Sequence, residues 1–421
     1  MHGDRLERIR ERLQLLARCD AQLQVFGAHQ HEYRLEPPLD EAEVAAFERM
    51  HGVSLPEDYR AFLTTLGNGG AGPFYGLAPL SAEAPRFAAT FDDAPPPSLA
   101  RPFALAEAWR QGEDDPKPPI TEGSNLYDGL VQLSDHGCGY FDVLIVAGPQ
   151  RGQVWADFTQ ALGGLERWYD SFLDGYEAWL DRAFVDWACE LLNANVAHED
   201  HVAAGLEIAA PLLERAVAER DSAPHDPALL AYPRDPAALV SALAYLRSEQ
   251  GQLADALALL DELPALTQGD GEARRHLGRA RVFGFDGDLE RALEEVEAGL
   301  ACEPLWFTTE LSLRRDKKEI LQALERDEDV IEALRELAQL QEHELFPQYD
   351  LAWALLERDR IDEAAAVLEA AAERGVACNR EDPLAQRIEQ VCEQLFEALE
   401  GEGLGDRAAA LRERLLGPLL N

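Results

Sequence analysis

The chain has 421 residues and carries a formal net charge of −41, because 79 acidic side chains stand against 38 basic ones. This length allows two or three domains with cores of their own, and a hydrophobic fraction of 47% is ordinary for a globular protein. Such a charge disfavours binding to nucleic acid phosphates or anionic membrane surfaces and favours a basic partner. The alternative explanation is a solubility trait, or the acidic composition shared by the proteins of a salt-tolerant organism.

The sequence contains no stretch near the ~18 uncharged apolar residues that a membrane-spanning helix needs. Its N-terminal segment is charged and has a helical pattern, without the apolar centre of a signal peptide. Six cysteines are scattered along the chain without a CxxC pair, which is typical of reduced, mostly buried thiols. We therefore expect a cytoplasmic protein.

Helices are expected at the start of the chain. Four apolar residues at helical spacing give the first helix its buried face: Leu6, Ile9, Leu13 and Leu16. A second helix begins near Leu39 and ends at Gly52, which can adopt the left-handed backbone of a helix C-terminus. Pro56 then opens a third helix at its first position, where a missing N–H costs nothing. The glycine-rich residues 67–70 end that helix, and a strand is expected to start at Phe74.

A group of strands is expected further along. Between Leu130 and Trp155 apolar residues alternate with polar ones and glycines interrupt the pattern, which predicts two to three antiparallel strands with a hairpin turn at residues 148–152. The segment DHGCG in this region places Cys138 two residues from His136, as a nucleophile and its base could be. That spacing does not require a hydrogen bond, and the glycines favour a structural turn with a buried thiol.

The order helix, Leu-Pro, helix, Asn-Gly-Gly and strand resembles the SUKH superfamily (the Smi/Knr family). The residues that carry the resemblance in this first block are Leu55, Pro56, Tyr59, Phe62, Leu63, Asn68, Gly69 and Gly70. A second block adds LVQL at 130–133, GCGY at 137–140, VLIV at 143–146, GQVW at 152–155 and Asp157. The closing helix adds Trp168, Tyr169, Phe172, Tyr176, Trp179 and Leu180. The resemblance spans residues 35–184 and implies, for residues 1–184, an α+β domain in which helices pack on an antiparallel sheet.

The rest of the chain has a helical pattern without strand signals, rich in Ala, Leu, Glu and Arg. We expect a helical connector and Pro-rich linker over residues 185–236, and an all-α helical-repeat domain over residues 237–421. The segment GQLADAL at residue 251 returns as GDLERAL at 287, one period of 36 residues later, and as DRIDEAA at 359, two further periods later. This period resembles the ~34-residue tetratricopeptide helix pair. The unit between, around residues 327–334, is out of phase.

No sequence signature of catalysis stands out, because GxGxxG, GxxxxGK[ST], GxSxG and HExxH are all absent. His29 and His31 alternate along the chain and could share one face of a strand, but no third metal ligand lies nearby. We therefore expect a protein that is not an enzyme and that needs neither a cofactor nor a metal.

The resemblance implies two possible functions. Bacterial SUKH domains resemble a family of immunity proteins that bind and block a cognate toxin, often a nuclease, and the charge of −41 would suit a basic toxin. Members in other cells resemble regulatory hubs, and helical repeats are common adaptors, so a cytoplasmic scaffold or regulatory adaptor is the alternative. Both imply a protein partner and neither nucleic acid nor membrane. No feature indicates an oligomeric state.

Under either function we expect the partner to bind exposed acidic and aromatic residues on loops of the first domain, because binding residues concentrate on loops held by a rigid scaffold. These residues are Asp92, Asp93, Glu113, Asp114, Asp115, Tyr127, Asp128 and Asp135. Three of them lie in the acid- and Pro-rich segment 111–122, which a solvated insertion would also explain.

Overall fold

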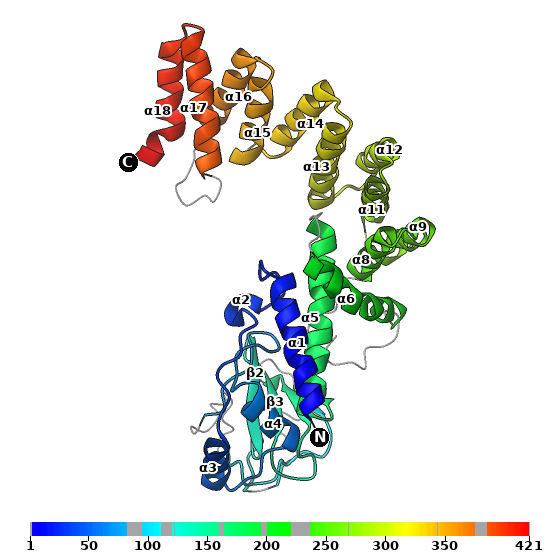
Figure 1. Ribbon diagram of the computed structural model, residues 1–421, viewed down its shortest axis with the longest axis vertical. Helices are drawn as coiled ribbons and strands as arrows, with labels where there is room; N and C mark the ends of the chain where they lie inside the picture. The colour runs from blue at the N-terminus through cyan, green and yellow to red at the C-terminus, as the bar shows by residue number, and fades with distance from the viewer. Residues whose placement is uncertain are drawn as a thin grey trace. The chain divides into compact units, whose positions relative to one another are not determined.

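The structure is a computed structural model. It describes residues 2–81, 95–110, 120–121, 123–159, 164–194, 200–219, 236–267, 269–342, 344–374 and 385–420. The chain divides into two compact units, Met1–Leu243 and Ala244–Asn421 (Figure 1). The expected division at residues 184 and 236 stays a prediction, since residues 220–235, at the end of the expected linker, lie outside the described ranges.

The first unit combines helices with one antiparallel sheet, as predicted. Its helices are α1 (Gly3–Cys19), α2 (Ala28–His31), α3 (Glu41–His51), α4 (Glu57–Thr65), α5 (Phe172–Ala194) and α6 (Asp200–Glu219). Its strands are β1 (Trp109–Arg110), β2 (Leu130–Gly137), β3 (Tyr140–Ile145), β4 (Val154–Asp157) and β5 (Gly164–Tyr169). They lie in the order β1-β5-β4-β3-β2, so the predicted strands between residues 130 and 155 are β2, β3 and the start of β4.

Local sequence signals explain the helices α3 and α4. Asp40 caps α3 by accepting a hydrogen bond from the Glu43 N–H at 2.8 Å, and the Glu43 carboxylate accepts one from the Asp40 N–H at 2.7 Å. Gly52 ends α3 with φ at 65°, the predicted left-handed position. Pro56 precedes α4 as its N-cap, one position earlier than expected.

The two faces of the sheet carry different side chains because residues alternate along a strand. Val143 and Ile145 of β3 pack into a cluster with buried aromatic residues that include Tyr127 and Trp155. Asp142, the residue immediately before Val143, therefore points to the opposite face of the sheet. That face holds a charged side chain that is only 4% exposed.

The strand expected at Phe74 does not form. Phe74 sits in a turn with φ at 54°, and only isolated bridges connect the following segment to the sheet, among them Leu77 with Ser134. The prediction failed because the glycines at 69, 70 and 76, all with positive φ, bend the chain too sharply for a regular strand.

Helix α1 lies along α5 (Figure 1), and both contact α6. The predicted apolar face of α1 is buried, and ion pairs complete the contact with α5. Arg5 Nη2 lies 2.6 Å from Asp174 Oδ1, and Arg12 Nη2 lies 2.5 Å from Asp181 Oδ1. The first and last parts of this unit are therefore packed together.

The second unit consists of helices, which confirms the predicted all-α region. After α8 (Pro236–Glu249), which crosses the boundary between the units, they are α9 (Leu253–Leu260), α10 (Leu263–Leu266), α11 (Gly271–Asp286), α12 (Leu289–Leu300), α13 (Phe307–Ala323), α14 (Asp327–Leu340), α15 (Leu345–Leu356), α16 (Ile361–Glu373), α17 (Ala385–Gly401) and α18 (Gly405–Leu420). Successive helices form hairpins, of which α11–α12, α13–α14, α15–α16 and α17–α18 each share a packed interface.

The hairpin turns of this unit repeat one hydrogen-bond pattern. Five of the turns in the described residues share this pattern, each around a left-handed residue: Gly251, Gly287, Glu325, Asp359 and Gly403. In each turn the next N–H donates to the carbonyl five residues before it, at 2.8–3.0 Å: Gln252 to Arg247, Asp288 to Phe283, Arg326 to Leu321, Arg360 to Leu355 and Leu404 to Leu399. Five residues after each left-handed residue stands a buried small one: Ala256, Ala292, Val330, Ala364 and Ala408. The predicted recurrence is thus a structural repeat, and the unit thought out of phase is displaced by two residues.

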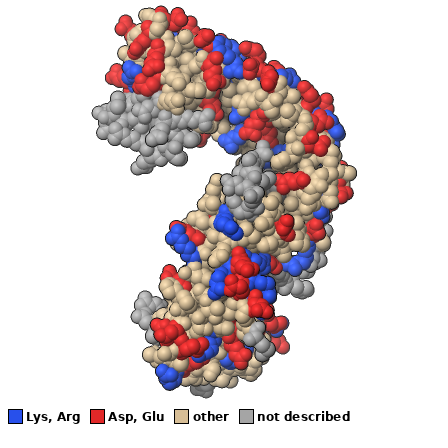
Figure 2. Space-filling model, in the orientation of Figure 1, with Lys and Arg blue, Asp and Glu red and all other residues tan. Residues whose placement is uncertain are grey.

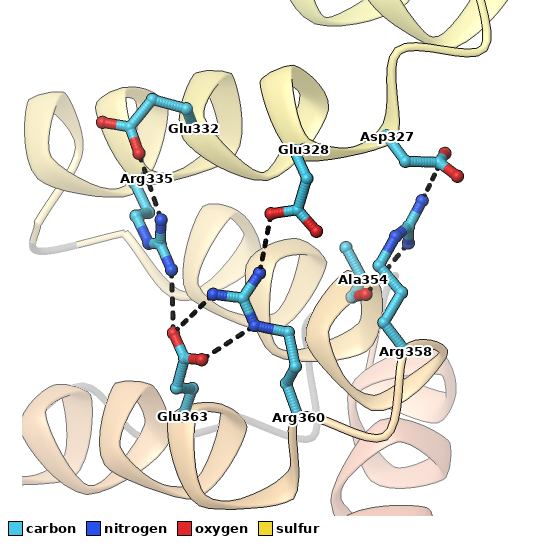
Figure 3. A network of polar contacts seen from close by, with 8 residues as sticks. All are labelled: Asp327, Glu328, Glu332, Arg335, Ala354, Arg358, Arg360 and Glu363. Atoms are coloured by element: carbon cyan, nitrogen blue, oxygen red, sulfur yellow. Dashed lines mark hydrogen bonds and ion pairs between the residues drawn. The ribbon is translucent and has the colours of Figure 1, made fainter.

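Ion pairs join adjacent hairpins (Figure 3). Arg358, beside the α15–α16 turn, bonds to Asp327 at the start of α14 at 2.5 Å, and Arg360 bonds to Glu328 at 3.1 Å. Arg360 also donates two hydrogen bonds to Glu363, at 2.8 and 2.9 Å. The arginines of one hairpin thus pair with carboxylates of the hairpin before it.

Candidate functional site

The first unit contains a pocket of about 340 Å³. Its walls come from the segment after α1, the turn before residue 75, strands β3 and β5, and helix α5. The lining residues are Gln24, Val25, Phe26, Pro73, Phe74, Asp142, Trp168, Tyr169, Gly175, Trp179, Arg182, Asp186 and Glu190. This volume lies at the small end of the ~300–1,000 Å³ range typical of ligand sites.

A glycine brings the first two walls together. Gly27 has φ at 81°, and a Cβ at this position would lie 1.7 Å from the carbonyl oxygen of Phe74. Only a residue without a side chain allows the two backbones to approach so closely. Phe26 and Phe74 consequently meet edge to face, with ring centroids 6.5 Å apart.

A buried polar cluster lies behind the pocket. The Ser134 hydroxyl donates to Asp142 Oδ2 at 2.5 Å, across the β2–β3 pair. His136 Nε2 lies 3.0 Å from Asp142 Oδ1. These two atoms are not aligned as a hydrogen bond, and each is buried without a hydrogen-bond partner among the described residues. The imidazole is held by stacking instead, 3.6 Å from the Phe74 ring and 5.6 Å from the Trp168 ring.

Two exposed aromatic residues stand at the mouth of the pocket. Phe26 is 47% exposed and Tyr75 is 39% exposed, and their ring centroids are 5.4 Å apart. Large aromatic side chains that remain exposed as a pair are typical of the residues that anchor protein partners. The mouth thus exposes two aromatic rings that contact each other.

The wall formed by α5 is charged. Asp186 and Glu190 are one helical turn apart, so both lie on the same side of the helix. Arg182, one turn earlier, has its Nε 3.7 Å from Asp186 Oδ2. With Asp142, three carboxylates and one guanidinium line the pocket.

Of the eight expected contact residues, some lie outside the described residues, one is exposed and two are buried. Asp92, Asp93, Glu113, Asp114 and Asp115 lie outside the described residues. Asp135 is exposed as expected. Its carbonyl accepts a hydrogen bond from the Tyr75 N–H at 3.2 Å, so it lies beside the aromatic pair at the pocket mouth.

The exposure expected for Tyr127 and Asp128 was wrong, since they are 2% and 1% exposed. Asp128 instead holds a loop together, because its carboxylate accepts hydrogen bonds from the Ser98 and Asn125 N–H groups and from Arg101 Nε, at 2.8–2.9 Å. The Tyr127 hydroxyl lies 2.8 Å from Thr159 Oγ1, and burial raises the pKa of its phenol. Both residues belong to the scaffold.

The expectation that the Cys138 thiol is buried was also wrong. Cys138 is exposed, with φ at 56°, at the tip of the β2–β3 hairpin. Cys138 lies in the turn between the two strands, whereas the His136 ring is buried in the aromatic stack against Phe74. A nucleophile–base pair between the two is therefore excluded by geometry.

The sequence did not indicate the pocket. Phe26, Phe74 and Trp168 are far apart in the chain, and nothing local marks them as neighbours. Within the described residues no group of His, Cys, Asp and Glu could hold a metal ion. No helix among those residues is long and apolar enough to span a membrane.

Comparisons with known proteins bear on both units. Residues 38–177 match the model of the SMI1 / KNR4 family (SUKH-1), which confirms the resemblance over this part of the chain. No curated protein matches. Among solved structures, the chain is similar to YrrB, described as a TPR protein with an unusual peptide-binding site. That match has 16% identity, covers 50% of this chain and 93% of that chain, and has a TM-score of 0.30. The assignment of helical repeats is therefore based on the hairpin geometry described above and not on this match.

Proposed function

We propose that this chain, with its SUKH-1 domain at residues 38–177, is a non-catalytic immunity protein that binds and neutralises a cognate basic toxin, such as a nuclease. SUKH domains are often immunity proteins, which act by binding and need no catalytic group. The observation that carries the proposal is the exposed pair Phe26 and Tyr75 beside a carboxylate-lined pocket, in a chain of net charge −41. On the face shown in Figure 2, Asp and Glu side chains are spread over both units. Such a field would speed the encounter with a basic protein.

The contact surface that we propose joins this mouth to the neighbouring acidic residues. It includes Phe26, Tyr75 and Asp135. We propose that it also includes five acidic residues outside the described ranges: Asp92, Asp93, Glu113, Asp114 and Asp115. Aromatic anchors would supply most of the affinity, and the carboxylates would supply orientation and rate. Binding of this kind would take place in the cytoplasm.

A second candidate function is a scaffold or regulatory adaptor. It is favoured by the array of helical hairpins in the second unit, which inhibition of a single toxin does not require. Stacked hairpins provide an extended surface on which a peptide or protein can bind. In that case the chain would hold several partners rather than one.

The experiment is a pull-down with the purified full chain from an extract of its own cells, at low and at high salt, followed by mass spectrometry. An immunity protein should capture one dominant basic protein that high salt releases, and co-expression should then suppress that protein's toxicity. Several partners that resist salt would favour the adaptor. An empty column at low salt would contradict both.

Two variants test whether the proposed contact surface binds the partner. The double change Phe26→Ala and Tyr75→Ala should weaken capture of the basic protein by at least tenfold, because both anchors are removed. The triple change Glu113→Ala, Asp114→Ala and Asp115→Ala should lower the association rate and its salt dependence. Met50→Ala, at an α3 residue that is 65% exposed, is the control and should change nothing. Equal binding by the control and the double variant would exclude the pocket mouth as the contact surface.

A further inference from the structure

Helix α13 carries a local excess of positive charge in a strongly acidic chain. The segment 314–318 (RRDKK) holds four cations and one carboxylate, and it contains two of the three lysines of the chain. The Asp316 carboxylate is bound to an arginine of α11 at 2.7 Å. Glu336 of α14 lies 2.7 Å from Arg314 and 3.4 Å from Lys317. These two carboxylates therefore already have cationic partners, and neither neutralises the other two cations of the segment.

Arg315 and Lys318 are the two cations that remain. Within the part of the chain that the structure describes, neither forms a hydrogen bond or an ion pair, not even with Glu319, one turn after Arg315. Every other lysine and arginine from residue 271 to residue 340 forms an ion pair, at 2.7–3.7 Å. Arg315 is exposed and Lys318 is half-buried. Both side chains can therefore bind an anionic group from outside the chain.

An aromatic residue lies on the same side of α13 as these two cations. Phe307, Leu311, Arg315 and Lys318 follow one another at intervals of four, four and three residues, which places them along one face of the helix; we call these four residues the α13 stripe. Phe307 is 54% exposed, and Leu311 is half-buried. At a rise of 1.5 Å per residue, Phe307 lies about 12 Å along the helix from Arg315 and about 16 Å from Lys318.

The composition of the α13 stripe favours an acidic segment of a protein as its ligand. An exposed phenylalanine suits an apolar side chain of a partner, and unpaired cations suit carboxylates. A polyanion such as nucleic acid fits less well. The stripe offers it only two cations, whereas the field of a chain with a net charge of −41 repels each further phosphate.

We infer that the α13 stripe binds an acidic segment of a partner protein, with an apolar side chain on Phe307 and carboxylates on Arg315 and Lys318. In an extended segment, which advances about 3.3 Å per residue, these distances correspond to carboxylates four and five residues from the apolar one. Such a ligand has the opposite charge from the basic protein proposed for the first unit. The inference therefore goes beyond the proposed function and does not rest on it.

The test measures binding of the full chain to three fluorescently labelled hexapeptides, by fluorescence anisotropy at low salt. LSGSEE has the inferred spacing, LSGSQQ lacks the charges, and LEESGS has the same composition with the carboxylates next to the leucine. LSGSEE should bind about fivefold more tightly than LSGSQQ, because only its carboxylates can pair with the two cations. It should bind about threefold more tightly than LEESGS, which cannot reach Phe307 and both cations at once.

Variants at the helix surface test each contact. The double change Arg315→Gln and Lys318→Gln should remove the preference for LSGSEE over LSGSQQ, and Phe307→Ala should remove the preference over LEESGS. Arg49→Gln, at an exposed cation of α3 that also lacks an ion pair among the described residues, is the matched control and should leave both preferences unchanged.

Equal affinity for LSGSEE and either of the other peptides, or no binding of LSGSEE, would overturn the inference. An unchanged preference in the double variant, or tighter binding of a short oligothymidylate than of LSGSEE, would overturn it as well. Capture of a basic protein from the cell extract should be the same for the double variant and the natural chain. A failure of the proposed function is thereby distinguished from a failure of the α13 stripe.

Discussion

The two units of this protein are stabilised by contacts of different range along the chain. In the first unit, Phe62 of α4 packs on Phe172 and Tyr176 of α5, more than a hundred residues away, with ring centroids 5.0 and 4.9 Å apart. In the second unit, each hairpin turn is closed by a hydrogen bond between residues five apart. Non-local packing can create a pocket from distant segments, whereas a local repeat creates a regular surface. The pocket of the first unit is built in this way, from segments far apart in the chain.

The largest expected effect comes from the non-local core. Phe62 is fully buried, so Phe62→Ala should lower the free energy of unfolding by about 3–5 kcal/mol, through lost burial and the cavity left behind. Denaturant unfolding monitored by hydrogen exchange should show the loss in the first unit. Phe307→Ala, at a residue of α13 that is 54% exposed, is the control and should change stability by less than about 0.5 kcal/mol. A loss of similar size in both variants would contradict the comparison.

The next effect depends on pH and again belongs to the first unit. Burial lowers the pKa of His31 from 6.5 to about 4, and its Nδ1 accepts a hydrogen bond from the Tyr33 N–H at 3.0 Å, which requires a neutral ring. Between pH 6.5 and about pH 4, His31 is protonated in the unfolded chain and neutral in the folded chain. The contribution of His31 to stability is therefore complete above pH 6.5 and is lost as the pH falls to 4, by as much as about 3 kcal/mol.

Unfolding free energies of the natural chain and of His31→Gln, measured from pH 7 to pH 4.5, test this expectation. The variant cannot titrate at this position, so its stability should fall less steeply over that range. Parallel pH profiles for the two proteins would show that His31 is protonated equally easily in the folded and unfolded states.

The smallest expected effects concern the repeated turns of the second unit. A Cβ at Gly287 would meet nothing within 4 Å. Gly287→Ala should therefore lower the free energy of unfolding by only about 1 kcal/mol, because alanine disfavours the left-handed backbone conformation. At the equivalent Asp359, with φ at 54°, Asp359→Gly should relieve that strain and stabilise the unit by less than about 1 kcal/mol. Thermal unfolding followed by circular dichroism measures both changes. If they have the same sign, the two turns are not equivalent.

Helix ends and repeats could be predicted from the sequence because they depend on residues only a few positions apart. Gly52 ends α3 as expected, and the recurrence at 251, 287 and 359 marks real hairpin turns. The unit that begins at the Glu325 turn was judged out of phase and the Gly403 turn was not predicted, because their spacing departs from 36 residues, although their hydrogen bonds are the same.

Exposure and proximity in the first unit were decided by the tertiary structure alone. Asp128 looked like a surface acid, but three donors from two other parts of the chain surround its carboxylate. Phe26, Phe74 and Trp168 became neighbours only when the glycine at position 27 and the sheet brought their segments together. The sequence by itself determined helix ends such as Gly52, the two to three strands between residues 130 and 155 and the hairpin repeats, since local backbone preferences and periodicity encode them. Only the tertiary structure determined the pocket and its buried carboxylate, because contacts between distant residues have no local signal.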